Sequence, residues 1–311
     1  MVVQGKINNK LVDFQKEGCR MVVKEYDRAH TFLEENEVAL LEREAVSQVI
    51  LYNAYQSRNI NIVEKGIFGV VKDEEKTILL FCNLIPHNLV ICVANQENAV
   101  VAAAFLADYL GNSRVMITGI NARNDVCVSF MEQYKKHINC SFTEKVGTDI
   151  MEIRKVNDIK PVEGSQRLAE LGDLKLIAEW MIEYQIEALT NEMDYEAALK
   201  KATKYIDEDR IYLYENDEHQ VVSMAIAARK LVHGMAITYV FTPEIFRGKG
   251  YAAANMYYLS RELLEQGFSF CTLFVDKKNP LSSRAYEKVG YVILEDDYEY
   301  KVIPTETTVT R

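Results

Sequence analysis

The feature that most constrains the fold is a repeat, because the two halves of the sequence show the same order of helix and strand patterns. Each half begins with helical periodicity, continues with three successive strand patterns, and ends with helix, strand, helix and strand. Matching segments lie roughly 150 residues apart, a spacing that favours a duplicated domain over a solenoid of short repeats. The boundary is expected within "VNDIKPVEGSQR" (156–167), which contains a proline and a glycine and lacks apolar periodicity.

We therefore predict one domain over 1–157 and a second over 165–311. In the first half, strands are expected at 21–26, 66–72, 77–84, 88–94, 114–120 and 148–156, and helices within 27–56 and at 99–110 and 124–138. In the second half, two or three helices are expected within 167–206, strands at 210–215, 220–229, 234–242, 269–276 and 291–303, and helices at 252–266 and 280–289.

The bulk composition is that of an ordinary globular protein, with 49% hydrophobic and 26% charged residues. A formal net charge of −10 argues against broad binding to nucleic acid, which needs a basic face, but it leaves room for a local cationic pocket. The N-terminus lacks an apolar signal core, and no segment approaches the ~20 apolar residues of a membrane span. No nucleic-acid or membrane partner is expected.

The cysteines argue for a reducing compartment. None of the six forms a C-x-x-C motif or lies at a zinc-site interval from a histidine, so no metal site is predicted. Several lie in apolar runs such as "ILLFCNL", which favours small buried side chains over disulfides. Together with the missing signal core, this predicts a cytoplasmic protein.

A glycine-rich turn, "FRGKGYA" (246–252), precedes a long run of good helix formers. Glycine permits positive φ and lets backbone approach a ligand closely. A helix N-terminus leaves N–H groups unpaired and carries a partial positive charge. With Arg247 and Lys249 beside Gly248 and Gly250, the segment is suited to binding a phosphate. The plain alternative is an ordinary strand-to-helix connection, which seldom needs two glycines flanked by two cations.

Two familiar phosphate motifs fit this turn less well. A Walker P-loop requires lysine directly after its last glycine, whereas Tyr251 follows Gly250. A dinucleotide fingerprint G-x-G-x-x-A is matched by Gly248, Gly250 and Ala253, and Asp276 closes a later strand. However, "PEIFR" separates the turn from its strand, and only about 60 residues follow, too few for a doubly wound sheet.

The segment "RGKGYA" (247–252) matches the R-x-x-G-x-A element, and this part of the chain resembles the GNAT acetyltransferase superfamily. The preceding "AITYVFTPEIF" is similar to that family's strand and loop, and "NPLSSRAYEKVGY" (279–291) to its following asparagine, helix and closing segment. The resemblance covers the chain from about residue 167 onward. It implies an α/β (α+β) fold of tandem GNAT-like domains, each a mixed, mostly antiparallel sheet flanked by helices.

The resemblance implies acetyl-CoA as cosubstrate. Backbone N–H groups of the turn would bind its pyrophosphate, strand 234–242 would splay from its neighbour to pair with the pantetheine arm, and Lys277, Lys278 and Arg284 are candidates for the outer phosphate. Asn279 would either bond the pantetheine or cap the following helix. The predicted coenzyme-binding residues are Val240, Phe241, Thr242, Arg247, Gly248, Lys249, Gly250, Tyr251, Ala252, Asn279, Ser283 and Tyr286.

The implied reaction is direct acetyl transfer from the thioester to a neutral amine. Tyr286 lies where the family has its general acid, and a phenol can protonate a departing thiolate; its alternative role is that of a core aromatic. Glu183 and Glu187 share one helix face and are candidate bases, with solvated surface carboxylates as the alternative. Tyr239 and Ser223 lie on the strands beneath.

The first half has "VANQENAVVAAA" (93–104) where the second has the glycine turn. It offers no glycine pair and no cation, and Glu97 would repel a phosphate. We therefore expect a degenerate GNAT-like domain without coenzyme, which walls the acceptor site, binds a second ligand or mediates dimerisation. GNAT folds often associate through strand edges and helices, so the resemblance also allows a homodimer.

The predicted function is an acetyl-CoA-dependent N-acetyltransferase that acts on a primary amine of a small molecule or amino-acid-like acceptor. Two alternatives remain: a non-catalytic acyl-CoA sensor that uses the same pocket, and an acetyltransferase for a protein amine. The enzyme is favoured because both Tyr286 and the splayed-strand segment are present.

Overall fold

The computed structural model describes residues 12–16, 19–58, 66–189 and 192–305, and the chain divides into two compact units. The first unit comprises Met1–Gly147 and Asp296–Arg311, and the second comprises Thr148–Glu295. Two strands run across a unit boundary: β7 (Cys140–Ile153) and β13 (Val292–Pro304).

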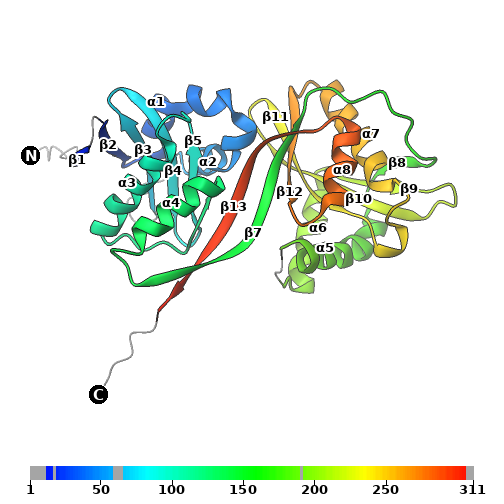
Figure 1. The fold of residues 1–311 in the computed structure, drawn as a ribbon. Helices are drawn as coiled ribbons and strands as arrows, with labels where there is room; N and C mark the ends of the chain where they lie inside the picture. The colour runs from blue at the N-terminus through cyan, green and yellow to red at the C-terminus, as the bar shows by residue number, and fades with distance from the viewer. Residues whose placement is uncertain (1–11, 17–18, 59–65, 190–191, 306–311) are drawn as a thin grey trace, which may run out of the picture. The chain divides into compact units, whose positions relative to one another are not determined.

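The first unit contains, in chain order, β1 (Val12–Lys16), β2 (Cys19–Tyr26), α1 (Ala29–Glu42), α2 (Glu44–Gln56), β3 (Gly66–Asp73), β4 (Lys76–Leu84), β5 (Leu89–Val93), α3 (Ala99–Asn112), β6 (Gly119–Ala122) and α4 (Asn124–Tyr134) (Figure 1). The second unit contains β8 (Ser165–Leu168), the 3₁₀ turn η1 (Leu171–Asp173), α5 (Leu174–Leu189), α6 (Tyr195–Asp207), β9 (Ile211–Glu215), β10 (Val221–Lys230), β11 (Gly234–Phe241), η2 (Glu244–Phe246), α7 (Tyr251–Glu265), β12 (Phe270–Asp276) and α8 (Pro280–Val289).

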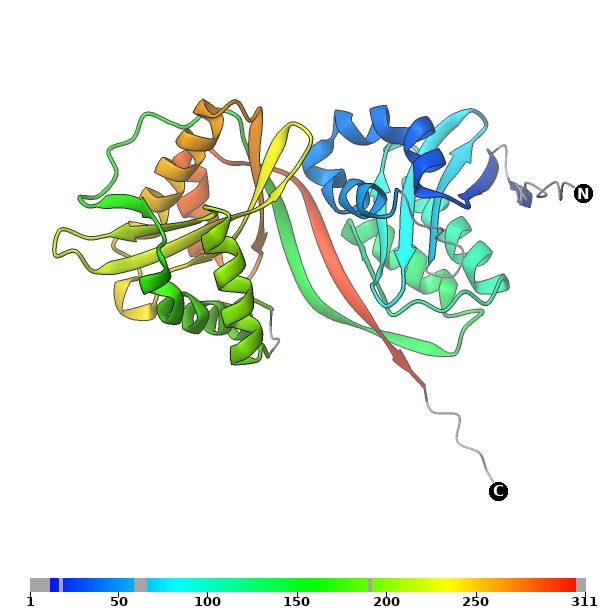
Figure 2. The same cartoon turned by 180° about the vertical axis from the view of Figure 1, so that it is seen from behind.

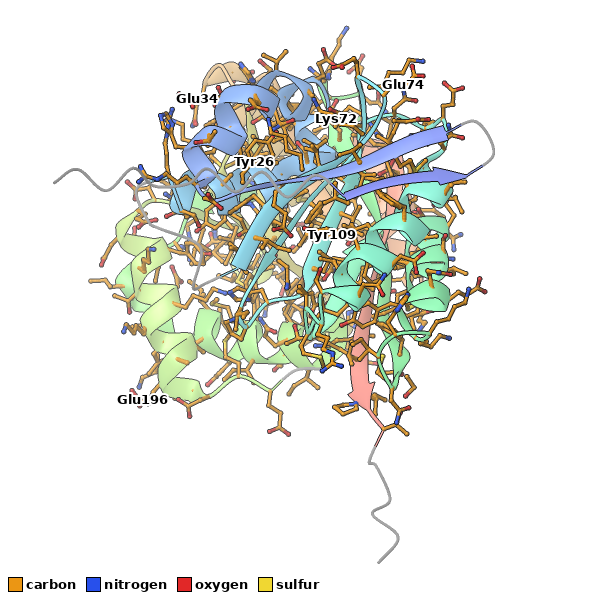
Figure 3. The ribbon with its side chains drawn as sticks, turned by 90° about the vertical axis from the view of Figure 1, so that its left-hand side faces the viewer. Tyr26, Glu34, Lys72, Glu74, Tyr109 and Glu196 are labelled. Carbon is orange, nitrogen blue, oxygen red and sulfur yellow. The ribbon has the colours of Figure 1, made fainter. Side chains whose placement is uncertain are left out.

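The sheet of the first unit lies between two helical layers. On one face Phe32 of α1 packs against Phe68, and on the other Leu106 of α3 belongs to the same apolar cluster as Phe81. Figure 1 shows α3 and α4 in front of this sheet, and Figure 2, seen from behind, brings α1 and α2 forward. Glu34 lies on the outer side of α1 and points away from the sheet (Figure 3). Apolar side chains therefore cover both faces of the sheet.

The second unit has the same three-layer construction. Trp180 of α5 packs against Phe241, with ring centroids 5.8 Å apart, in a cluster that covers one face. Met256 of α7 and Val289 of α8 share a cluster with Leu273 on the other face. The fold class is thus confirmed as mixed α/β, with largely antiparallel sheets flanked by helices.

Helix α6 shows how the sequence determines one of these layers. Asp194 accepts hydrogen bonds from the N–H groups of Glu196 and Ala197 and so caps the first turn. Ala198 and Ala202, four residues apart, are fully buried toward the core. Glu196 is exposed, and Figure 3 shows it at the outer end of the helix. The helix therefore has one small, apolar face and one polar face.

The last strand of each half pairs within the other unit. Residues of β13 pair antiparallel with β6 of the first unit, with Tyr298 opposite Ala122. Residues of β7 pair antiparallel with β12 of the second unit, with Ile153 opposite Cys271. The compact units divide the chain at other positions than the predicted domains 1–157 and 165–311, because residues 148–157 group with the second unit and residues 296–311 with the first.

The predicted element order is present in both units, with local differences. The strand predicted at 114–120 is wrong over most of its length, since β6 is Gly119–Ala122. Arg114 has a φ of 54°, and the Val115 N–H donates to Leu110 O at 2.9 Å, so these residues close helix α3. Strand β8 lies partly within the predicted linker and pairs antiparallel with β9.

None of the described helices has the length and apolar character that crossing a bilayer requires.

Candidate active site

The glycine turn between β11 and α7 has the backbone conformation that the sequence predicts for a phosphate-binding turn. Gly248 and Gly250 have φ values of 78° and 90°, in the left-handed region that side chains disfavour. Gly250 is the N-cap residue of α7, and its carbonyl accepts the first helical hydrogen bond, from Ala254 N–H at 3.0 Å. The N–H groups at the head of this helix consequently have no intrahelical acceptor.

Hydrogen bonds of the Arg247 side chain connect this turn to two neighbouring elements. Its Nε donates to Thr242 O at 2.8 Å, and its Nη2 donates to Glu187 Oε2 at 2.6 Å. Lys249 has its Nζ 5.6 Å from the ring centroid of Phe246. Arg247 is therefore tied to the end of β11 and to helix α5, while the Lys249 ammonium lies beside the turn.

Strand β11 separates from β12 before it reaches the turn. The parallel pairing of these strands covers Gly234–Ala236, opposite Phe270–Thr272, and extends no further. On its other edge, the register between β11 and β10 shifts, and Tyr239 has a φ of 50°, which marks a bulge. The backbone of Val240 lies in this diverging segment. The expected splay is therefore present, and it leaves strand-edge backbone that an extended arm can pair with.

Two of the predicted coenzyme-binding residues at the end of β11, Phe241 and Thr242, already form hydrogen bonds within the protein. Ser223 Oγ donates to the Phe241 carbonyl at 3.2 Å and accepts from the Thr242 hydroxyl at 3.0 Å. The Thr242 carbonyl accepts from Arg247, as described above. Ser223 therefore fixes the end of β11 from the neighbouring strand β10.

Tyr286 lies on α8 and is buried, with 6% of its surface exposed. Burial raises the pKa of Tyr286 well above that of an ordinary tyrosine, the nearby Tyr184 phenol raises it further, and a hydrogen bond with the Ser282 side chain opposes the shift. The ring of Tyr184 in turn packs against that of Tyr239 in a tilted arrangement, with ring centroids 4.8 Å apart. The phenol of Tyr286 thus stays protonated at neutral pH.

Asn279 caps helix α8. Its side-chain oxygen accepts from Ser282 N–H at 3.2 Å, and Pro280 follows in the first helical turn. Ser283, half-buried in the same turn, donates its backbone N–H to Asn279 O at 3.4 Å. Of the two roles left open for Asn279, the cap is therefore present in this structure.

The cations expected to bind the outer phosphate of the coenzyme lie directly after β12 and on helix α8. Lys277 forms an ion pair with Asp149 on β7, and Arg284 donates from Nε to Pro280 O at 3.2 Å. Lys278 is exposed, and its N–H donates to Asp276 Oδ1 at 2.8 Å. The Lys277 charge is thus partly compensated by a neighbouring carboxylate.

The two candidate bases on α5 have different surroundings. Both Glu183 and Glu187 are exposed. Glu187 forms the ion pair with Arg247, whereas the described residues provide no hydrogen-bond or ion-pair partner for Glu183. The two carboxylates therefore differ in that only Glu187 is held by an ion pair among the described residues.

A polar network around Tyr239 was not predicted from the sequence. The Tyr239 hydroxyl accepts a hydrogen bond from Gln185 Nε2 at 2.6 Å and another from Lys201 Nζ at 2.9 Å. Lys201 could have been identified from its place on α6, where it borders the buried stripe of Ala198 and Ala202.

The equivalent turn of the first unit has the same left-handed backbone conformation but different side chains. Asn98, the N-cap of α3, has a φ of 64°, in the same left-handed region as Gly250. Its side chain donates to Asp73 at 3.1 Å, and Glu97 lies 3.7 Å from Lys76. Strands β5 and β6 also pair over only two residues, but here Arg123 bonds Gln96 across their ends. Interacting side chains therefore occupy the turn of the first unit, and the carboxylates of Glu97 and Asp73 are among them.

Comparisons with known proteins agree with this geometry. Residues 174–291 match the model of the Acetyltransferase (GNAT) family. No curated protein sequence matches the chain. Among solved structures, a GNAT-family acetyltransferase from Colwellia psychrerythraea is 9% identical with a TM-score of 0.52, over 90% of this chain and 99% of that one.

Two further structures match almost the whole chain. A Drosophila protein is 10% identical with a TM-score of 0.58, over 96% of this chain and all of its own. A GCN5-related N-acetyltransferase from Sphaerobacter thermophilus is 12% identical with a TM-score of 0.55, over 92% and 96% of the two chains. At these identities the likeness concerns the fold.

The second unit therefore contains a GNAT acetyltransferase domain, and the protein is an acyltransferase by class. The family uses acetyl-CoA as its acetyl donor.

Proposed function

We propose that the second unit transfers an acetyl group from acetyl-CoA directly to the primary amine of a small molecule or amino-acid-like acceptor. The observation that carries this proposal is the combination of two left-handed glycines at the head of α7 with the diverging strand β11 beside them. The turn suits a diphosphate, the strand edge suits an amide-containing arm, and the two are contiguous in the chain.

The coenzyme would be held mainly by backbone. N–H groups from Gly248 to Ala252 would bind the pyrophosphate, with Lys249 adding charge beside them. The Val240 backbone would pair with the pantetheine amide and polarise the acetyl carbonyl as negative charge develops on its oxygen. The remaining coenzyme contacts proposed are those of Phe241, Thr242, Arg247, Asn279, Ser283 and Tyr286.

The chain's own residues would then move two protons. As the amine nitrogen bonds to the acetyl carbon, the carbon–sulfur bond breaks and the electron pair leaves with sulfur. Tyr286 would donate its proton to that thiolate. The proton lost by the amine would pass to a carboxylate of α5, directly or through water, and we assign this to Glu183 in preference to Glu187 because Glu187 is paired with Arg247.

We propose that the first unit is a degenerate GNAT-like domain without coenzyme. Asn98 adopts the left-handed conformation but carries a side chain that donates to Asp73, and the neighbouring Gln96 and Glu97 interact with Arg123 and Lys76, so the turn lacks the exposed backbone of a glycine pair. The five cysteines whose side chains are described are buried, and none of them is in a disulfide, which supports a cytoplasmic location.

The test is release of free thiol from acetyl-CoA in the presence of a panel of primary amines. Release that depends on the amine, with the acetylated product identified by mass, supports the proposal. Tight coenzyme binding without release for any small amine or peptide amine would instead identify an acyl-CoA sensor. Release with peptide amines alone would favour the protein acetyltransferase.

A further inference from the structure

Lys201 is a half-buried cation without a counter-ion among the described residues. Its Nζ lies 2.9 Å from the Tyr239 hydroxyl oxygen and 4.8 Å from the ring centroid of the same residue. The described part of the chain places no carboxylate within ion-pair distance of it. Because this protein carries a net charge of −10, carboxylates are plentiful elsewhere, and a half-buried ammonium without one has room for an anionic partner.

The Tyr239 hydroxyl, like Lys201, can donate a hydrogen bond to a further partner. Its oxygen already accepts from Gln185 Nε2 and Lys201 Nζ, which occupy its lone pairs. Tyr239 is only 3% exposed, and no residue that the structure describes accepts its O–H proton. Lys201 and Tyr239 thus together present hydrogen-bond donors and no acceptor, a combination suited to a carboxylate.

This pair of donors lies near the proposed reaction centre. Tyr239 is the bulged residue of β11, next to Val240, whose backbone would receive the pantetheine arm. Tyr184 contacts Tyr239 through its ring and is the tyrosine that influences the pKa of Tyr286. Lys201 is therefore connected through Tyr239 to Tyr184, whose charge influences Tyr286.

We propose that Lys201 and the Tyr239 hydroxyl bind a carboxylate of the acceptor, so that the acceptor is an amine that also bears a carboxylate, such as an amino acid. This inference rests on the proposed acetyltransferase function and narrows its substrate class. Trp180 and Phe241 belong to the same buried apolar cluster as Tyr239, and a charged contact is stronger beside such an apolar cluster than in water.

The experiment compares amines of matched chain length that end in either a carboxylate or a carboxamide, assayed by thiol release with acetyl-CoA. The variant is Lys201→Met, and the control is Lys200→Met, an exposed neighbour on the same helix. We expect the unmodified protein to prefer the carboxylate by roughly ten- to a hundredfold in kcat/KM, chiefly through KM. Lys201→Met should remove that preference while its turnover of carboxamides stays within about twofold, and Lys200→Met should keep it.

Equal use of carboxylate and carboxamide by the unmodified protein would overturn the inference. So would an equal loss of both activities in Lys201→Met, because Lys201 would then act only by holding Tyr239 in place. If no amine releases thiol although coenzyme A binds, the proposed transferase function fails. The carboxylate site is then judged by calorimetry with 4-aminobutyrate and coenzyme A: binding that Lys201→Met removes supports it, and absence of binding overturns it.

Discussion

Glu187 on α5 accepts a hydrogen bond at 2.6 Å from Arg247, the cation that opens the glycine turn before α7. Both side chains are substantially exposed, at 49% and 40%. The ion pair therefore holds Arg247 in position, and Glu187 competes with a bound diphosphate for the positive charge of Arg247. This role differs from that of a general base.

Glu187→Gln should leave kcat nearly unchanged and leave coenzyme affinity equal or up to about fivefold tighter, since an exposed ion pair contributes little. Steady-state kinetics and calorimetry with coenzyme A measure the two effects. Glu183→Gln is the comparison, because we expect it to lower kcat. A large fall in kcat for Glu187→Gln with unchanged coenzyme affinity would reverse the assignment of the base.

Tyr286→Phe should lower kcat by roughly 10²- to 10⁴-fold, because the thiolate would leave without a proton donor. Coenzyme affinity should stay within a few fold, as the aromatic ring still fills the same buried space. Tyr257→Phe, on the neighbouring helix α7, is the control. Unchanged turnover in Tyr286→Phe would assign this residue to the core alone.

The pH dependence of kcat/KM tests the state of the same phenol. Burial raises the pKa of Tyr286, so its neutral, donating form persists below that raised value and is lost only above it. We therefore expect activity to rise with pH as the amine loses its proton, with no falling limb below about pH 10. A fall near pH ~9 that is absent in Tyr286→Phe would contradict the raised pKa.

Substitution of the turn glycine separates strain from ligand binding. Gly250→Ala places a Cβ at a φ of 90° and 2.9 Å from Val162 Cγ1, and should weaken coenzyme binding by roughly tenfold or more. Gly267, after α7, has a similar φ of 100°, and the space that an added methyl group would occupy is open. Gly267→Ala therefore carries a comparable strain of ~1–2 kcal/mol but should keep coenzyme affinity; equal losses would attribute the effect to folding.

The exchanged terminal strands give a stability prediction. Ending the chain after Glu295 removes the residues that pair with β6, so amide protection of Gly119–Ala122 should fall, while β9 and β10 of the second unit keep theirs. Hydrogen exchange measures both, and a chain ending at Thr305 is the control. Glu299→Pro is a milder variant that interrupts the same pairing, opposite Asn121. Loss of protection confined to the second unit would contradict the exchange.

The repeated element order and the glycine turn could be predicted from sequence because both depend on local patterns. Hydrophobic periodicity identified most of the strands, though not β1 or β8 and not the position of β6, and the glycines at 248 and 250 favoured the positive φ that both adopt. The exchange of β7 and β13 could not be predicted, because a strand pattern does not specify which sheet edge the strand joins. Likewise, Lys201 and Tyr239 are 38 residues apart, and only the packing of α6 on β11 brings them together.

The most direct test of the central claim is an isothermal titration of the whole chain with acetyl-CoA. We predict one coenzyme per chain, with binding weakened in Gly250→Ala and retained in Gly267→Ala. Absence of binding would contradict the proposed diphosphate site, and two equivalents per chain would contradict the assignment of the first unit as a domain without coenzyme.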